Sequence, residues 1–78
     1  MSEADKLFEE LGYKKRESSK TIVIYESKNK IIEIGCPDNI GRPVIFVYMR
    51  RNNILYARGI TMQELKAIYK KCEELEWI

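Results

Sequence analysis

The sequence predicts an α+β fold in one domain, residues 1–78: a two-layer sandwich in the order helix, four or five-stranded antiparallel sheet, helix. Two observations predict this layout. Apolar residues recur at helical spacing near both ends of the chain, and the segment between them alternates with a period of two. The chain has 78 residues, 45% hydrophobic and 33% charged, which is typical of a folded domain rather than a disordered tail.

The first helix is predicted from one apolar stripe with the spacing i, i+3, i+4 and i+7, formed by Ala4, Leu7, Phe8 and Leu11. Ser2 precedes the stripe and can accept a hydrogen bond from a backbone N–H of the first turn. Gly12 follows the stripe, where helices commonly end with a residue in the left-handed conformation. We therefore expect a helix that begins after Ser2 and ends before Gly12.

The next 46 residues, 13–58, predict strands joined by short connections. The expected strands are a polar edge strand and two hairpins: Tyr13–Glu17, Thr21–Glu26, Lys30–Cys36, Val44–Arg50 and Ile54–Arg58. Pro37 and Pro43 bracket a loop between the hairpins, because proline cannot continue a strand ladder. Residues 28–29 and 52–53 are the expected hairpin turns, since asparagine tolerates a positive φ.

The last helix has the clearest start signal in the chain. Thr61 and Glu64 form a T-x-x-E capping box, which satisfies two backbone donors at the helix start. We expect Trp77 and Ile78 to fold back on the core. The stripe expected to face the core consists of Leu65, Ile68, Tyr69, Cys72 and Leu75.

The predicted strands carry more apolar residues than two helices can cover. The predicted register leaves Ile22, Ile24 and Ile31 on the face assigned to solvent. Soluble monomers rarely expose a contiguous apolar patch of this kind. Three explanations remain open: the sheet curls over the second face, the helices lie on opposite faces, or a partner covers the face. Ile22, Ile24 and Ile31 are therefore the candidate partner-binding residues.

The reactive side chains argue against catalysis and metal binding. The chain has no histidine, which is the usual group for proton transfer near neutral pH and the commonest metal ligand. Cys36 ends a predicted strand without a base beside it, and Cys72 lies on the predicted helix stripe. Glu26 and Glu33 share a predicted face, where cross-strand carboxylates are most often solvated. We expect no catalytic residue, no metal and no cofactor.

The sequence also predicts a reduced, cytoplasmic location. Residues 1–5 lack the basic and apolar regions of a signal peptide. The longest apolar run, Val44–Met49, is too short to span a bilayer. Two cysteines do not make the disulfide framework of a small secreted protein.

A second function would use the basic residues. The net charge is +2, which mildly favours anionic partners but lies below that of dedicated DNA-binding proteins. In the predicted register Tyr48 and Tyr56 point to opposite faces, so they cannot form one stacking platform. The candidates for binding nucleic acid or a small anionic nucleotide are Lys14, Lys15, Arg42, Arg50, Arg51 and Arg58.

The segments at the two ends of the chain are similar to segments of known proteins. Residues 4–13 read ADKLFEELGY, and residues 60–65 and 74–77 read ITMQEL and ELEW. These segments resemble small uncharacterised proteins of phages and prophages of low-GC Gram-positive bacteria. The resemblance covers the two predicted helices, assigns no role to any residue, and implies glycine at position 76, where this chain has Glu76.

What the resemblance implies is a phage protein that acts inside a bacterial host. Small phage proteins without catalytic machinery often occupy a surface on a host or defence protein, or hold a signalling nucleotide. We therefore expect a non-catalytic interaction protein that binds a host protein or forms a homodimer through the face containing Ile22, Ile24 and Ile31. The alternative is binding of nucleic acid or an anionic ligand, and no membrane is expected.

Overall fold

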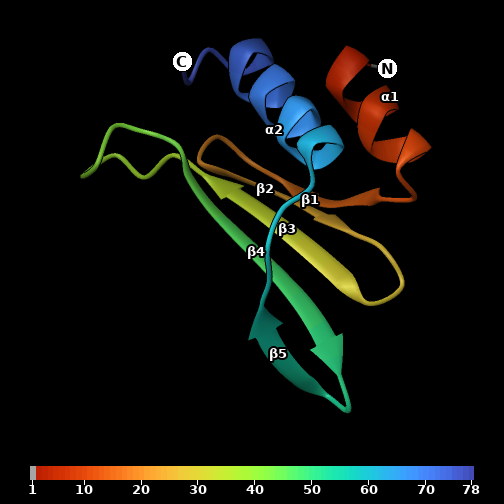
Figure 1. Ribbon diagram of the computed structural model, residues 1–78. Coiled ribbons are helices and arrows are strands. Elements are labelled where there is room, and N and C mark those ends of the chain that lie inside the picture. The colour runs from red at the N-terminus through yellow and green to blue at the C-terminus, as the bar shows by residue number, and fades with distance from the viewer. Residues whose placement is uncertain (1) are drawn as a thin grey trace.

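A computed structural model describes residues 2–78 and shows two terminal helices and a five-stranded antiparallel sheet (Figure 1). The strands lie in the sheet in their sequence order, so the sheet is a meander. This layout confirms the predicted α+β fold. The elements are α1 (Glu3–Glu10), β1 (Lys14–Ser18), β2 (Ile22–Glu26), β3 (Lys30–Gly35), β4 (Val44–Arg51), β5 (Ile54–Ala57) and α2 (Met62–Glu74).

The pairing register agrees with the alternation in the sequence. Tyr25 lies opposite Ile32 in the hairpin of β2 and β3, as the predicted turn requires. The hairpin of β4 and β5 turns at Asn52 and Asn53, whose φ angles are 52° and 63°. Two positive φ angles are the requirement of a type I′ turn, whose twist matches the twist of the strands that it joins.

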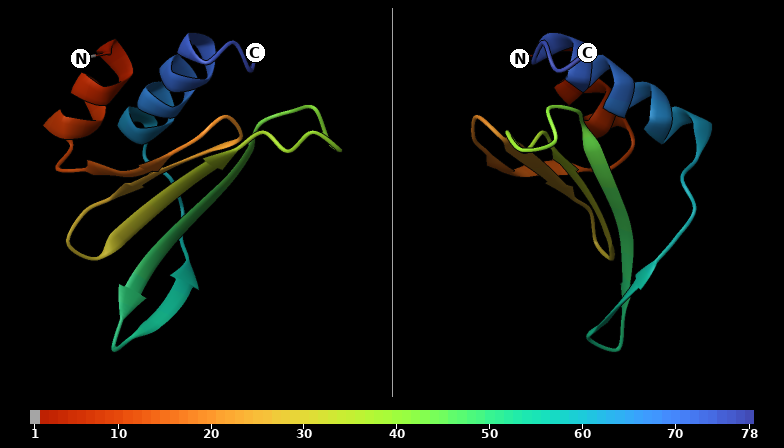
Figure 2. Two further views of the ribbon diagram at one scale, coloured as in Figure 1. Left: turned by 180° about the vertical axis from the view of Figure 1, so that it is seen from behind. Right: turned by 90° about the vertical axis from the view of Figure 1, so that its left-hand side faces the viewer.

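Both helices lie on the same side of the sheet, which excludes helices on opposite faces (Figure 2). We call this side the helix side and the other side the open face. The core is formed between the helices and the first three strands. Its buried members are Phe8, Tyr13, Val23, Tyr25, Ile32, Ile34, Ala67, Ile68 and Cys72. Within it the rings of Phe8 and Tyr25 stack with their centroids 3.7 Å apart.

The helix stripe predicted for α2 is wrong at two positions. Leu65 and Tyr69 are exposed, whereas Glu64 and Lys71, which are not part of the predicted stripe, are buried. The buried side of α2 is rotated because it contacts both the sheet and α1, where Glu64 and Lys71 find oppositely charged partners. Trp77 packs against the core as expected, but Ile78 is exposed.

The two helices end with the same hydrogen-bond pattern. In α1 the N–H of Tyr13 donates to the carbonyl of Phe8, and Gly12 between them has φ 90°. In α2 the N–H of Trp77 donates to the carbonyl of Cys72, and the left-handed position is occupied by Glu76, with φ 58°. Both ends are Schellman motifs, and the second places a side chain where glycine is the preferred residue.

Glu76→Gly is expected to stabilise the protein by about 0.5–1 kcal/mol, because glycine adopts a positive φ without the clash of a Cβ atom. Urea denaturation of the two proteins measures the difference. The matched control is Glu73→Gly inside α2, which should destabilise by about 1 kcal/mol, since glycine is a poor helix former. Equal destabilisation by both changes would contradict the strain assigned to position 76.

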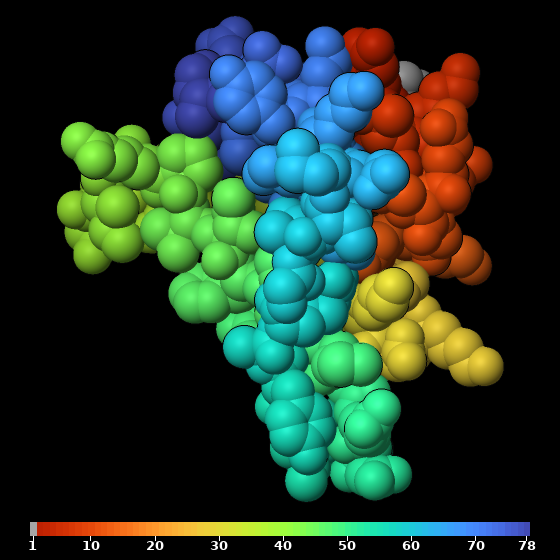
Figure 3. Space-filling model, viewed as in Figure 1, coloured from red at the N-terminus to blue at the C-terminus, as the bar shows by residue number. Residues whose placement is uncertain are grey.

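The hairpin of β4 and β5 projects beyond the helices (Figure 3). All four residues of β5 are exposed, and Ile54, Leu55 and Tyr56 are about half exposed, at 54%, 50% and 47%. The helical layer therefore covers the first strands of the meander and leaves the last two largely open on both sides.

Candidate interaction surface

The open face carries a set of apolar side chains that crosses the sheet from β2 to β5. The register places Ile24 beside Glu33 and Glu33 beside Phe46, and it places Ile31 beside Tyr48. Because side chains alternate along a strand, the face is fixed by these pairs. Its apolar members are Ile22, Ile24, Ile31, Val44, Phe46, Tyr48, Leu55 and Ala57.

The candidate residues Ile22, Ile24 and Ile31 differ in exposure. Ile22 and Ile24 are half-buried, and Ile31 is only 8% exposed. Ile31 is central in the sheet and lies between Glu26 on β2 and Tyr48 on β4. The structure thus brings the three residues to one face, but the most accessible apolar part of that face lies on β4 and β5.

Phe46, Leu55 and Ile40 are exposed large apolar residues on or beside the open face. The rings of Phe46 and Tyr48 are parallel and stacked, with centroids 6.1 Å apart. Ile40 lies in the loop between β3 and β4 and shares a shallow hollow with Phe46 and Ile22. Sequence reasoning missed Ile40, although it is the one large apolar residue between Pro37 and Pro43.

Glu33 gives the open face a charged centre. It is half-buried between Ile24 and Phe46, and it makes no ion pair with any residue in the described range 2–78. By contrast, Glu26 on the same face pairs with Arg16, with 2.9 Å between Oε2 and Nη1. Glu33 is therefore a carboxylate on the open face without an ion-pair partner among residues 2–78.

A cluster of polar side chains on the helix side joins the start of α2 to the end of β5. The guanidinium of Arg58 donates to both carboxylate oxygens of Glu64, at 3.0 Å and 2.8 Å, and to the Tyr13 hydroxyl oxygen at 2.7 Å. Tyr13 in turn donates its hydroxyl proton to Glu64. Glu64 also accepts from the backbone N–H of Thr61, which completes the predicted capping box.

These contacts control the ionisation of the cluster. Burial raises the pKa of the Glu64 carboxyl, but hydrogen bonds from Arg58, Thr61 and Tyr13 outweigh it and lower the pKa to about 2. Burial, together with the neighbouring Glu64 carboxylate, raises the pKa of Tyr13 well above its usual range. Glu64 is therefore ionised and Tyr13 neutral at pH 7.

A second polar cluster joins α1 to α2 and the sheet. Asp5 accepts hydrogen bonds from Tyr25, Lys71 and Lys15; the two lysine nitrogens lie 3.2 Å and 3.0 Å from its oxygens. Burial raises the pKa of Asp5, but these three donors outweigh it and hold the pKa well below its ordinary value. Sequence reasoning missed this cluster, because Asp5 and Lys71 are distant in sequence.

The structure does not bring the basic candidates together. Arg58 and Lys15 are held in the two polar clusters just described. Lys14 lies on the edge strand β1, Arg50 and Arg51 lie at the end of β4 next to its turn, and Arg42 lies in the loop before β4. Since β1 and β5 are the opposite edges of the sheet, these cations do not form one basic surface.

The two cysteines are free thiols in different surroundings. Cys72 is buried in the core, and its burial raises the thiol pKa, so the reactive thiolate is disfavoured. Cys36 is half-buried at the end of β3. Among the described residues, no group of three or more Cys, Asp or Glu side chains is placed to hold a metal ion.

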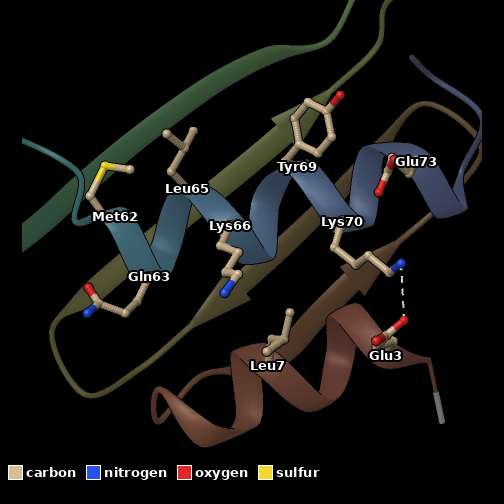
Figure 4. A pocket seen from close by; sticks show the side chains of 9 residues that line it. All are labelled: Glu3, Leu7, Met62, Gln63, Leu65, Lys66, Tyr69, Lys70 and Glu73. Atoms are coloured by element: carbon tan, nitrogen blue, oxygen red, sulfur yellow. Dashed lines mark ion pairs between the residues drawn. The ribbon is translucent and has the colours of Figure 1, made fainter.

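A second hollow lies on the outer side of the two helices (Figure 4). The side chains of Gln63, Lys66 and Lys70 point from α2 toward α1, and Lys70 pairs with Glu3 at 3.1 Å. Met62, Leu65 and Tyr69 point away from α1. Large apolar residues are therefore exposed on the helix side as well: Met62, Leu65 and Tyr69 on α2, and Ile45, Ile54 and Tyr56 on β4 and β5.

Comparisons of the chain with models of protein families, with curated proteins and with solved structures find no match. Neither α1 nor α2, the helices in the described part of the chain, is long and apolar enough to cross a membrane.

Proposed function

We propose that the protein is a non-catalytic interaction protein of phage type, which acts in the host cytoplasm by binding a host or defence protein through its open face. The main support is the exposed apolar surface of Phe46 and Leu55, extended by Ile40 at the rim. Contiguous apolar surface with a polar rim is typical of protein interfaces. The groups with the most perturbed carboxyl pKa values, Asp5 and Glu64, belong to structural clusters on the other side of the sheet.

Glu33 indicates the chemistry of the partner. A carboxylate without a cation, surrounded by apolar side chains, is costly to cover with another apolar surface. A lysine or arginine of the partner that reaches Glu33 would remove this cost and select the partner. The expected partner surface is therefore apolar with a basic residue near its centre.

A second copy of this chain is poorly suited to bind the open face. A two-fold axis through its centre would place two Glu33 carboxylates close together, and like charges repel strongly in a desolvated interface. We therefore assign the open face to a different protein.

Binding of nucleic acid or an anionic nucleotide has less support. It would use Lys14, Arg42, Arg50 and Arg51, which lie at separate edges and ends of the sheet. A strong dependence of any binding on salt concentration would favour this alternative.

The test is site-specific photocrosslinking followed by affinity measurement. A benzophenone amino acid replaces Phe46 in the protein, expressed in the cells from which the gene comes, and replaces Met62 in the control. Met62 is the matched position because it is exposed, apolar and on the helical layer. We expect a protein adduct at position 46 that is absent at position 62, and the captured protein is then purified.

With the purified partner, Phe46→Glu is expected to weaken binding at least about 30-fold, since a hot-spot side chain contributes about 2 kcal/mol or more. Glu33→Lys should also weaken binding, because it would place two cations together. Met62→Glu should leave the dissociation constant within about twofold. Adducts of equal yield at positions 46 and 62 would overturn the proposal. So would a dissociation constant that neither Phe46→Glu nor Glu33→Lys changes.

A further inference from the structure

β5 is an edge strand that lacks the usual protection against pairing. Its four residues, Ile54–Ala57, contain no charge and no proline, and all four are exposed. Its ladder with β4 runs from Arg51 opposite Ile54 to Tyr48 opposite Ala57 without a bulge. Such a strand is a ready template for another strand, since the backbone groups on its outer side are unpaired.

The other edge of the sheet shows the contrast. β1 reads KKRES, and its register with β2 shifts between Lys15 and Glu17, the mark of a β-bulge. Charged side chains and bulges are the devices by which natural sheets discourage edge pairing. The chain therefore protects one edge of its sheet and leaves the other one open.

The register identifies the free backbone groups of β5. The N–H of Arg58 donates to the carbonyl of Val47, so residues 58, 56 and 54 direct their backbone groups toward β4. Leu55 and Ala57 consequently direct theirs away from the sheet. No hydrogen bond within residues 2–78 uses these outward groups, and β5 is the outermost strand in Figure 1.

We propose that β5 pairs antiparallel with β5 of a second copy of this chain, around a two-fold axis at Tyr56. In this register Leu55 lies opposite Ala57 of the partner subunit, and Ala57 lies opposite Leu55 of the partner subunit. The two reciprocal pairs satisfy every outward N–H and C=O of Leu55 and Ala57. Registers centred on residue 55 or 57 would instead need the turn residue Asn53 or Gly59, which lie outside the strand.

The side chains suit this pairing on both sides of the strand. On the helix side the two Tyr56 side chains become direct cross-strand neighbours, and aromatic pairs of this kind stabilise sheets. On the other side Leu55 packs beside the small Ala57 of the partner subunit. The result is one continuous sheet made from two copies of the five-stranded sheet.

This inference concerns an edge rather than the open face, so it goes beyond the proposed function and does not depend on it. A four-residue strand pair buries little surface and belongs at the low end of interface sizes. We therefore expect a weak dimer with a dissociation constant of about 10–100 µM.

The first test is sedimentation equilibrium over a wide concentration range. The wild-type protein should change from monomer to dimer with rising concentration. Ala57→Pro removes an outward N–H but no bond to β4, so it should leave a folded monomer with at least a tenfold weaker association. Ala57→Val keeps the N–H and is the matched control, with an association within about twofold. Circular dichroism checks the fold of both variants.

A disulfide trap tests the register. Across the proposed axis the Cα atoms of the two residues at position 56 would lie about 4.5 Å apart, within disulfide range. The two residues at position 54 would lie about 14 Å apart, since they are offset by four residues along two neighbouring strands. Tyr56→Cys should therefore give a covalent dimer under mild oxidation and Ile54→Cys should not, with the oxidised wild-type protein as background for Cys36 and Cys72.

A protein that stays monomeric at millimolar concentration would overturn the inference. So would a dimer that Ala57→Pro leaves intact, or equal trapping at positions 54 and 56. The proposed function would survive these results, because photocrosslinking from position 46 reports on the open face alone. Conversely, loss of the partner adduct at position 46 would leave the edge dimer unaffected.

Discussion

Replacing Glu64 with alanine is expected to lower the free energy of unfolding by about 3–5 kcal/mol. The change removes the acceptor of both the Arg58 guanidinium and the Tyr13 hydroxyl, whose residues are largely buried. It also removes half of the capping box at the start of α2. Because a domain of this size has a total stability of about 4–12 kcal/mol, this loss is at least about a quarter of the total.

Chemical denaturation followed by circular dichroism measures this loss. Glu73→Ala, an exposed position on the same helix, is the matched control and should change the stability by less than about 0.5 kcal/mol. Arg58→Met in the Glu64→Ala background should recover part of the loss, because it removes the unpaired buried cation. Equal stability of Glu64→Ala and Glu73→Ala would show that the cluster contributes nothing.

The protein is expected to lose stability steeply in acid, between about pH 4.5 and pH 2. The pKa of Glu64 is lowered from 4.5 to about 2 in the folded protein, so the folded state holds its proton less tightly than the unfolded state. Its contribution is therefore complete above pH 4.5 and is lost as the pH falls toward 2. At about 1.4 kcal/mol for each pKa unit, Glu64 accounts for about 3 kcal/mol.

Asp5 adds to the same acid dependence, because its pKa is also lowered by its hydrogen-bond donors. Urea denaturation at a series of pH values between 7 and 2 gives the profile. The double variant Asp5→Asn, Glu64→Gln should be less stable at pH 7 and have a much flatter profile, since neither amide titrates. A wild-type stability that stays constant down to pH 2.5 would contradict the assignment of both clusters.

The elements and the register could be predicted from the sequence because their signals are local. Alternation defined the strands, two adjacent asparagines defined the two-residue turn between β4 and β5, and T-x-x-E defined the start of α2. The inward side of α2 could not be predicted from apolar spacing alone. Lys71 is buried because its ammonium group donates a hydrogen bond to Asp5. No local sequence pattern predicts a partner so distant in the chain.

The candidate surface was predictable only in part. Alternation placed Ile22, Ile24 and Ile31 on the uncovered face, and the observed register keeps them there. Exposure depends on what lies beside each residue, and Ile31 is covered between Glu26 and Tyr48 in the middle of the sheet. Ile40 lies at the rim of the open face because of the path of the loop between β3 and β4. No periodic pattern in the sequence predicts the path of a loop.

The contact between the first and last helices also sets the order in which the protein can be completed during synthesis. Each strand of the meander pairs with its neighbour in sequence, so the hairpins can form from short-range contacts as the chain emerges. Phe8 and Tyr25, however, belong to a core cluster that also contains Ile68 and Cys72 of α2. The helix side of the sheet therefore stays exposed to solvent until both helices have packed on it.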